Sequence, residues 1–146
     1  MSTRISDESR DLADQLHSMA IHLLRKLRRE DAASGLTAPR LSALSVIVFA
    51  GPVALGDLAT AEQVRPPTMT RIVDALAEQG LVTKKRNAED GRSTLIHATA
   101  AGKKLLKRGR ERRVRTLRRQ IAALRTDDLA ALRDAAEILK RVIAAI

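Results

Sequence analysis

Residues 81–99, LVTKKRNAEDGRSTLIHAT, are the most informative stretch of this chain because they predict a basic β-hairpin. Residues 81–86 and 92–99 are extended in character and rich in β-branched side chains, which favour strands. The sequence between them, Asn-Ala-Glu-Asp-Gly at 87–91, is typical of a turn. Three consecutive cations lie in the first strand and Arg92 follows the turn, so a two-stranded hairpin with a cationic tip is expected.

Two short helices are predicted immediately before the hairpin. The first fits residues 56–63. It is followed by Val-Arg-Pro-Pro at 64–67, where the prolines suit the first turn of a helix but not its interior, so the second helix is expected to begin near Pro66. Gly80 supplies its C-terminal stop. Four apolar residues of this second helix recur at i, i+3, i+4 and i+7 and predict one buried face: Met69, Ile72, Val73 and Leu76.

Amphipathic helices are predicted on both sides of this central part. Residues 7–30 place apolar side chains at steps of three and four, with acidic residues early and basic residues late, as the helix dipole favours. A further helix starts at Thr37 as its cap and ends before the next Gly-Pro pair. Downstream, Thr99 caps a long helix to about residue 124, and residues 126–128 cap a final helix with the apolar spacing of a coiled-coil seam.

The fold class that follows is mainly α with a small β-hairpin. Four helices, a hairpin and two helices, in that order, place a winged helix-turn-helix in residues 35–99. The amphipathic helices in residues 1–34 and 100–146 are expected to be dimerisation helices that join two copies of the chain. The alternative is that they only close the core of a single copy.

Positive charge is concentrated in one segment of the sequence. The chain has 146 residues, with 27 Lys and Arg against 17 Asp and Glu, and a net charge of +10. Between Lys84 and Arg119 there are 14 basic and 3 acidic residues, whereas the rest of the chain is nearly balanced. This excess predicts a polyanionic partner, although its helical part also fits a solvated cationic helix. Phe49 is the only aromatic residue, which argues against recognition of RNA or single strands by stacking.

Several kinds of chemistry are excluded or disfavoured. The chain has no cysteine, which excludes disulfides, thiolate zinc sites and thiol redox sensing. His17 and His22 are five residues apart and do not share a helical face, so a metal site is not expected. No catalytic motif is evident, and we expect neither an enzyme nor a cofactor. No N-terminal signal segment and no membrane-length apolar run are evident, so a cytoplasmic protein is expected.

Two stretches of the chain match a known pattern of motifs. One comprises residues 58–59 and 64–82, LA followed by VRPPTMTRIVDALAEQGLV, and the other is residues 90–102, DGRSTLIHATAAG. In this order and spacing they resemble the recognition helix and the wing of the MarR family of bacterial transcriptional regulators (multiple antibiotic resistance regulators), and the likeness extends over nearly the full chain. Two positions depart from the pattern. Ala98 stands where leucine is usual, and Arg65 stands where Ser or Asp would cap the recognition helix.

The wing supplies the first group of candidate DNA contacts. An arginine at a hairpin tip can enter a narrow minor groove, and the neighbouring Asp90 can hold the Arg92 guanidinium in place. The resemblance implies these roles, and the alternative is an ordinary surface ion pair. Lys84, Lys85 and Arg86 are expected to make salt-dependent phosphate contacts.

The helix that is expected to begin near Pro66 supplies the second group of candidate DNA contacts. Thr68 and Arg71, on its polar side, are expected to meet base edges or phosphates, and Pro67 a thymine methyl group. Arg65 is placed to grip a phosphate, and Thr70 is expected to contact a phosphate or a local backbone group. The full set of predicted DNA-binding residues is Thr37, Arg40, Arg65, Pro67, Thr68, Thr70, Arg71, Lys84, Lys85, Arg86, Asp90, Arg92 and Ser93.

The resemblance implies a homodimer on a pseudo-palindromic duplex site, commonly acting as a repressor. It also implies a small aromatic or anionic effector between the dimerisation helices and the winged helix, for which the candidate residues are His17, Ile21, Leu24 and Val48. Two other functions remain open from the residues alone. One is a sequence-independent architectural DNA-binding protein, and the other is an interaction module whose basic helix docks on an acidic protein or a membrane.

Overall fold

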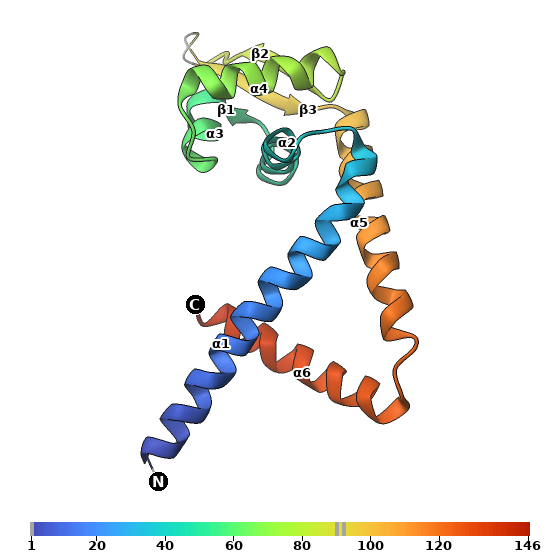
Figure 1. The fold of residues 1–146 in the computed structure, drawn as a ribbon. Helices are drawn as coiled ribbons and strands as arrows, with labels where there is room; N and C mark the ends of the chain where they lie inside the picture. The colour runs from blue at the N-terminus through green and yellow to red at the C-terminus, as the bar shows by residue number, and fades with distance from the viewer. Residues whose placement is uncertain (1, 90, 92) are drawn as a thin grey trace. The chain divides into compact units, whose positions relative to one another are not determined.

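The computed structural model describes residues 2–89, 91 and 93–146, with side chains from residue 7 onward (Figure 1). The chain divides into two compact units, Met1–Glu111 and Arg112–Ile146. The predicted fold class, mainly α with a small antiparallel sheet, is confirmed. The elements are α1 (Ser2–Leu27), a 3₁₀ helix η1 (Arg28–Ser34), α2 (Ala38–Ala50), β1 (Val53–Ala54), α3 (Leu55–Ala61), α4 (Pro66–Glu78), β2 (Val82–Arg86), β3 (Thr94–Ala98), α5 (Ala100–Ile121) and α6 (Thr126–Ala144).

The sheet has one strand more than the sequence predicted. The β2–β3 hairpin is confirmed, with Val82 opposite Ala98 and Arg86 opposite Thr94. β1 pairs with the other edge of β3, with Val53 opposite Ile96, so the strand order is β1-β3-β2. A strand of two residues is too short to show an alternating pattern, and it forms here because β3 offers a free edge for pairing.

The core of the first unit lies between helices α2, α3 and α4 and the sheet. α2 packs against α4 and β3, and α3 packs against α4 and β1. The predicted apolar face of α4 is confirmed, since three of its four residues are buried and Ile72 is partly buried. The largest fully buried side chains of the unit are Leu44, Ile47, Leu58, Met69, Val73, Leu76, Val82 and Ile96. This packing leaves the opposite face of α4 free to meet a partner.

A network of backbone and threonine contacts joins the end of α4 to the start of α5. Gly80 follows α4 in the left-handed region, with φ of 69°. The Thr99 hydroxyl donates to the Gly80 carbonyl oxygen at 2.7 Å and accepts from the Gly102 N–H at 3.1 Å. The predicted Thr99 cap is therefore confirmed, and it also ties the helix to the turn after α4.

Replacing Thr99 by valine is expected to lower the free energy of unfolding by about 1–2 kcal/mol, because the cap and the bond to Gly80 are both lost while the side-chain shape is kept. Urea denaturation measures the change. Thr83→Val, at an exposed position on β2, is the matched control and is expected to change stability by less than about 0.5 kcal/mol. Equal midpoints for the two variants would contradict the structural role of the Thr99 hydroxyl.

Some helix ends differ from their prediction. α1 is followed by the 3₁₀ turn η1, which ends at Gly35 with φ of 71°, instead of continuing to residue 30 as an α-helix. The expected cap of α6 by residues 126–128 is wrong, because Arg125 is the N-cap residue and Thr126 already lies in the helix. The two aspartates occupy the first turn, where they favour the helix dipole. Thr37 does precede α2, but its side chain makes no capping hydrogen bond within the described part of the chain.

The length and apolar character of the described helices bear on whether any of them could span a membrane. None of them alone is long and apolar enough to cross a bilayer. Only Asp7–Ser34 and Ala38–Ala50 taken together meet the length and composition required, and this pair is bent by 90°.

Candidate nucleic-acid interface

The exposed face of α4 carries the predicted base-contacting residues. Pro67, Thr68 and Arg71 are all exposed, on the side of the helix away from its buried residues. They lie in the first half of the helix, the end that enters a major groove in helix-turn-helix proteins. Arg65 is the N-cap residue, and it is exposed with no side-chain capping bond in the described structure. The helix therefore presents two cations, a hydroxyl and a proline ring to solvent.

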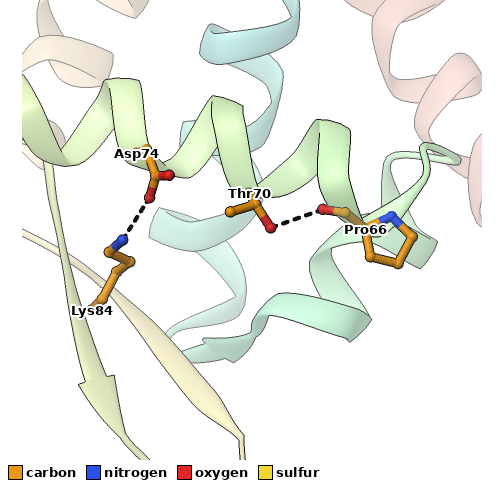
Figure 2. A network of polar contacts seen from close by, with 4 residues as sticks. All are labelled: Pro66, Thr70, Asp74 and Lys84. Atoms are coloured by element: carbon orange, nitrogen blue, oxygen red, sulfur yellow. Dashed lines mark hydrogen bonds and ion pairs between the residues drawn. The ribbon is translucent and has the colours of Figure 1, made fainter.

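The Thr70 hydroxyl has a local partner. It donates to the carbonyl oxygen of Pro66 at 3.0 Å, one turn earlier in the helix (Figure 2). A hydroxyl has one proton, so in this arrangement it has none left to donate to a phosphate. Of the two roles expected for Thr70, the structure shows the local backbone contact.

An ion pair joins the wing to α4. The Lys84 ammonium lies 2.5 Å from one carboxylate oxygen of Asp74, and both side chains are a little under half exposed (Figure 2). Lys84 was predicted as a phosphate contact, and Asp74 was not predicted as a site residue. Asp74 follows Arg71 by three residues and so lies on the same side of α4. Asp74 and Lys84 are ten residues apart and meet only because β2 packs against α4.

The three cations of β2 do not point the same way. Successive side chains of a strand alternate between its two faces. Lys84 is opposite the buried Ile96 in the sheet register and shares its face with Val82, which is the face that packs on the helices. Lys85 therefore lies on the other face, and both lysines and Arg86 are exposed.

The base of the hairpin loop is held by backbone and side-chain contacts. The Asn87 N–H donates to the Ser93 carbonyl oxygen at 2.9 Å, and the Asn87 side-chain amide donates to the Ser93 hydroxyl at 3.2 Å. The Asn87 side-chain oxygen accepts from the Glu89 N–H at 3.1 Å, which is an Asx turn. Asp90 and Arg92, predicted to form the functional pair of the wing, lie outside the described residues.

The remaining predicted residues lie on α1 and at the start and end of α2. Thr37 is exposed and Arg40 is half-buried. Of the candidate effector residues, Val48 is half-buried on α2. The other three, His17, Ile21 and Leu24, are exposed on α1 at helical steps of four and three, so they share one face of that helix.

The described residues hold no group of three His, Asp or Glu side chains that is arranged to bind a metal ion. What the first unit does present is a helix with an exposed polar and cationic face, set beside a basic β-hairpin on a three-helix core. These features define a winged helix-turn-helix DNA-binding protein.

Comparison with known proteins gives the family. Residues 36–94 match the model of the MarR family. An uncharacterized HTH-type transcriptional regulator of Mycobacterium leprae, ML2140, is 34% identical over 137 residues, which cover 94% of this chain and 96% of that protein. The chain therefore belongs to the MarR family, as its motifs predicted. It is a DNA-binding transcriptional regulator and not an enzyme.

Solved structures share the fold over nearly the full chain. The transcriptional regulator Tm0710 of Thermotoga maritima has a TM-score of 0.84 at 22% identity, covering 93% of this chain and 96% of its own. A mutant of S. aureus MepR bound to an oligodeoxyribonucleotide has a TM-score of 0.71 at 16% identity, covering 92% and 97%. At these identities the likeness establishes the fold alone.

Proposed function

We propose that this regulator binds a pseudo-palindromic operator as a homodimer, represses transcription by occupying the promoter, and releases DNA in response to a small effector. The observation that carries the proposal is the exposed polar face of α4 beside the basic wing. Arg71 on that face has the reach and the planar donors to pair with guanine O6 and N7, while the wing cations supply phosphate contacts. In this proposal residues 35–99 bind DNA and residues 1–34 and 100–146 form the dimer.

Exposed apolar side chains on the N-terminal helix α1 and the C-terminal helix α6 support the homodimer. On α1, Leu12, Met19 and Leu23 are about half exposed, and on α6 Ile138 and Ile143 are exposed to a similar or greater extent. Large apolar side chains exposed together on one helix are a feature of protein–protein interaction surfaces. A second copy is the occupant that fits, because a two-fold dimer presents two recognition helices about 34 Å apart, the spacing of adjacent major grooves on one side of the duplex.

The effector part of the proposal concerns the face of α1 formed by His17, Ile21 and Leu24, together with Val48 of α2. A small aromatic or anionic compound there would relieve DNA binding only if it prefers the arrangement of the dimer that cannot bind DNA. Equal affinity for both arrangements would shift nothing, however tight the binding.

The proposal is tested by footprinting the purified protein across the DNA that flanks its own gene, followed by competition with random-sequence duplex. The expected footprint consists of two protected half-sites about one helical turn apart, and random duplex is expected to compete poorly. A single half-site would argue against the dimeric part of the proposal. Equal competition by random duplex would argue against sequence-specific regulation altogether.

Arg71→Ala is expected to weaken binding to the protected fragment by about 1–2 kcal/mol, because a base-reading or phosphate-binding cation is removed from the recognition helix. Fluorescence anisotropy with labelled duplexes measures the change. Arg71→Lys is the control, since it keeps the charge but not the bidentate geometry. If lysine restores affinity fully, Arg71 holds a phosphate. If it restores only the affinity for random duplex, Arg71 reads a base.

A second candidate function, sequence-independent coating of DNA, is favoured by one observation. Lys103, Lys104, Lys107 and Arg108 are all exposed on the first half of α5. Such a cationic surface binds phosphates without reading sequence. The competition assay described above separates the two functions.

A further inference from the structure

An acidic side chain lies on the surface of the recognition helix that is proposed to face DNA. Asp74 follows Arg71 by three residues and Pro67 by seven, so the three share one side of α4. A carboxylate in this place repels the phosphates that the neighbouring cations attract. The charge of Asp74 by itself therefore lowers the affinity for DNA, and its presence on this surface calls for a second role.

The partner of Asp74 indicates what that task is. Its carboxylate is 2.5 Å from the Lys84 ammonium on β2, the first of the three wing cations (Figure 2). Lys84 reaches it because this side chain shares the strand face of the buried Val82, which packs towards the helices. The pair thus connects the recognition helix to the wing at the point where both would approach the duplex.

The stability of the fold does not account for this pair. Both side chains are a little under half exposed, and exposed ion pairs contribute about 0–1 kcal/mol. The pair has a more direct consequence for DNA binding than for stability. A lysine held by a carboxylate no longer adds a net charge to the neutralisation of phosphates, and its side chain no longer moves independently of α4.

We propose that Asp74 is a positioning and specificity-determining residue: by holding Lys84 it restrains the wing against the recognition helix and suppresses sequence-independent binding. A phosphate contact by Lys84 would add the same affinity at every site on DNA, whereas restraint of the wing favours only the complex in which α4 reads bases. Loss of the pair therefore raises non-specific affinity in full and specific affinity by less. The inference rests on the proposed sequence-specific function, because a specificity ratio exists only if the protein prefers one duplex over another.

The decisive variant is Asp74→Asn, which keeps the shape of the side chain and removes its charge. We expect affinity for a random-sequence duplex at low salt to rise about threefold, and the slope of log affinity against log salt to steepen by about 0.9, the value for one more neutralised phosphate. Affinity for the footprinted fragment is expected to rise less, so that the ratio of specific to non-specific affinity falls.

Two matched controls separate the pair from general charge effects. Glu78→Gln removes an exposed carboxylate one turn further along the same side of α4 and is expected to change the salt slope by clearly less. Lys85→Gln, on the other face of β2, is expected to flatten the slope by about 0.9, whereas Lys84→Gln is expected to flatten it less. Equal effects of the two lysine variants would contradict the inference, and this comparison does not depend on Asp74→Asn being folded.

The double variant Asp74→Asn/Lys84→Gln completes a double-mutant cycle, which measures the coupling between the two residues. We expect the effect of Asp74→Asn on the salt slope to disappear when Lys84 is already neutral. An effect that persists undiminished, or one matched by Glu78→Gln, would overturn the role of the pair. If the unaltered protein itself shows no preference between the footprinted fragment and random duplex, the proposed function fails instead, and the salt slopes still report whether Asp74 holds Lys84.

Discussion

Gly102→Ala is expected to lower the free energy of unfolding by about 2–3 kcal/mol, although alanine is normally the better helix residue. A Cβ at this position would collide with the carbonyl oxygen of Leu81 and would lie 3.2 Å from Cδ1 of Leu44. The Leu81 carbonyl cannot move easily, because it accepts the Thr99 N–H at 3.0 Å and belongs to the turn between α4 and β2. The added methyl group therefore separates α5 from the core or strains the turn.

Gly56→Ala is the matched control for this prediction. Gly56 also lies in a helix, α3, and a Cβ built there meets nothing within 4 Å. Alanine at this position is expected to be neutral or to stabilise the protein by up to about 1 kcal/mol. Urea denaturation at a fixed protein concentration compares the two, since association would shift the apparent stability. A Gly102→Ala variant as stable as the unaltered protein would show that the turn after α4 can shift to accommodate the added methyl group.

Arg92→Ala is expected to weaken DNA binding by about 1–3 kcal/mol, the largest loss expected from a single wing residue. The role of Arg92 rests on its place after the turn of the hairpin and on the family signature, since it lies outside the described residues. The described part of the loop supports this placement. Asn87 and Ser93 close its base, and Gly91 takes a left-handed φ of 63° that favours glycine.

The pattern of loss across sequences identifies what Arg92 contacts. A loss confined to duplexes with a narrow minor groove at the expected position would indicate shape or base recognition, and a uniform loss would indicate a phosphate contact. Asp90→Asn tests the supporting role of the neighbouring carboxylate and is expected to have a smaller effect in the same direction. Unchanged affinity for every duplex after Arg92→Ala would show that the tip of the wing does not contact DNA.

Elements controlled by local chemistry were predictable. Pro66 begins α4 because the first turn needs no N–H from it, and Gly80 ends that helix because it takes a positive φ. The β2–β3 hairpin follows from its strand composition and its turn residues. Thr99 caps α5 as predicted, since the cap depends on residues only three apart.

Features that depend on distant residues were not predictable. β1 exists because β3 offers an edge, and two residues carry no periodic signal of their own. No local pattern marks Gly102 as a packing residue, because the carbonyl oxygen of Leu81 that leaves no room for a Cβ there comes from the other side of the hairpin. Helical spacing alone puts Asp74 on the same side of α4 as Arg71, but its pairing with Lys84 required the packing of β2 on α4.

Periodicity, turn chemistry and motifs act over a few neighbouring residues, so the order of the helices, the hairpin, the concentration of positive charge and the family were all predictable from the sequence. Which of the two lysines of β2 pairs with a carboxylate depends instead on tertiary packing. Lys84 and Lys85 are adjacent and chemically identical, yet the alternation of the strand turns one towards the Asp74 carboxylate and the other away from it. A pairing between two elements arises only when they pack together, and no local pattern encodes it.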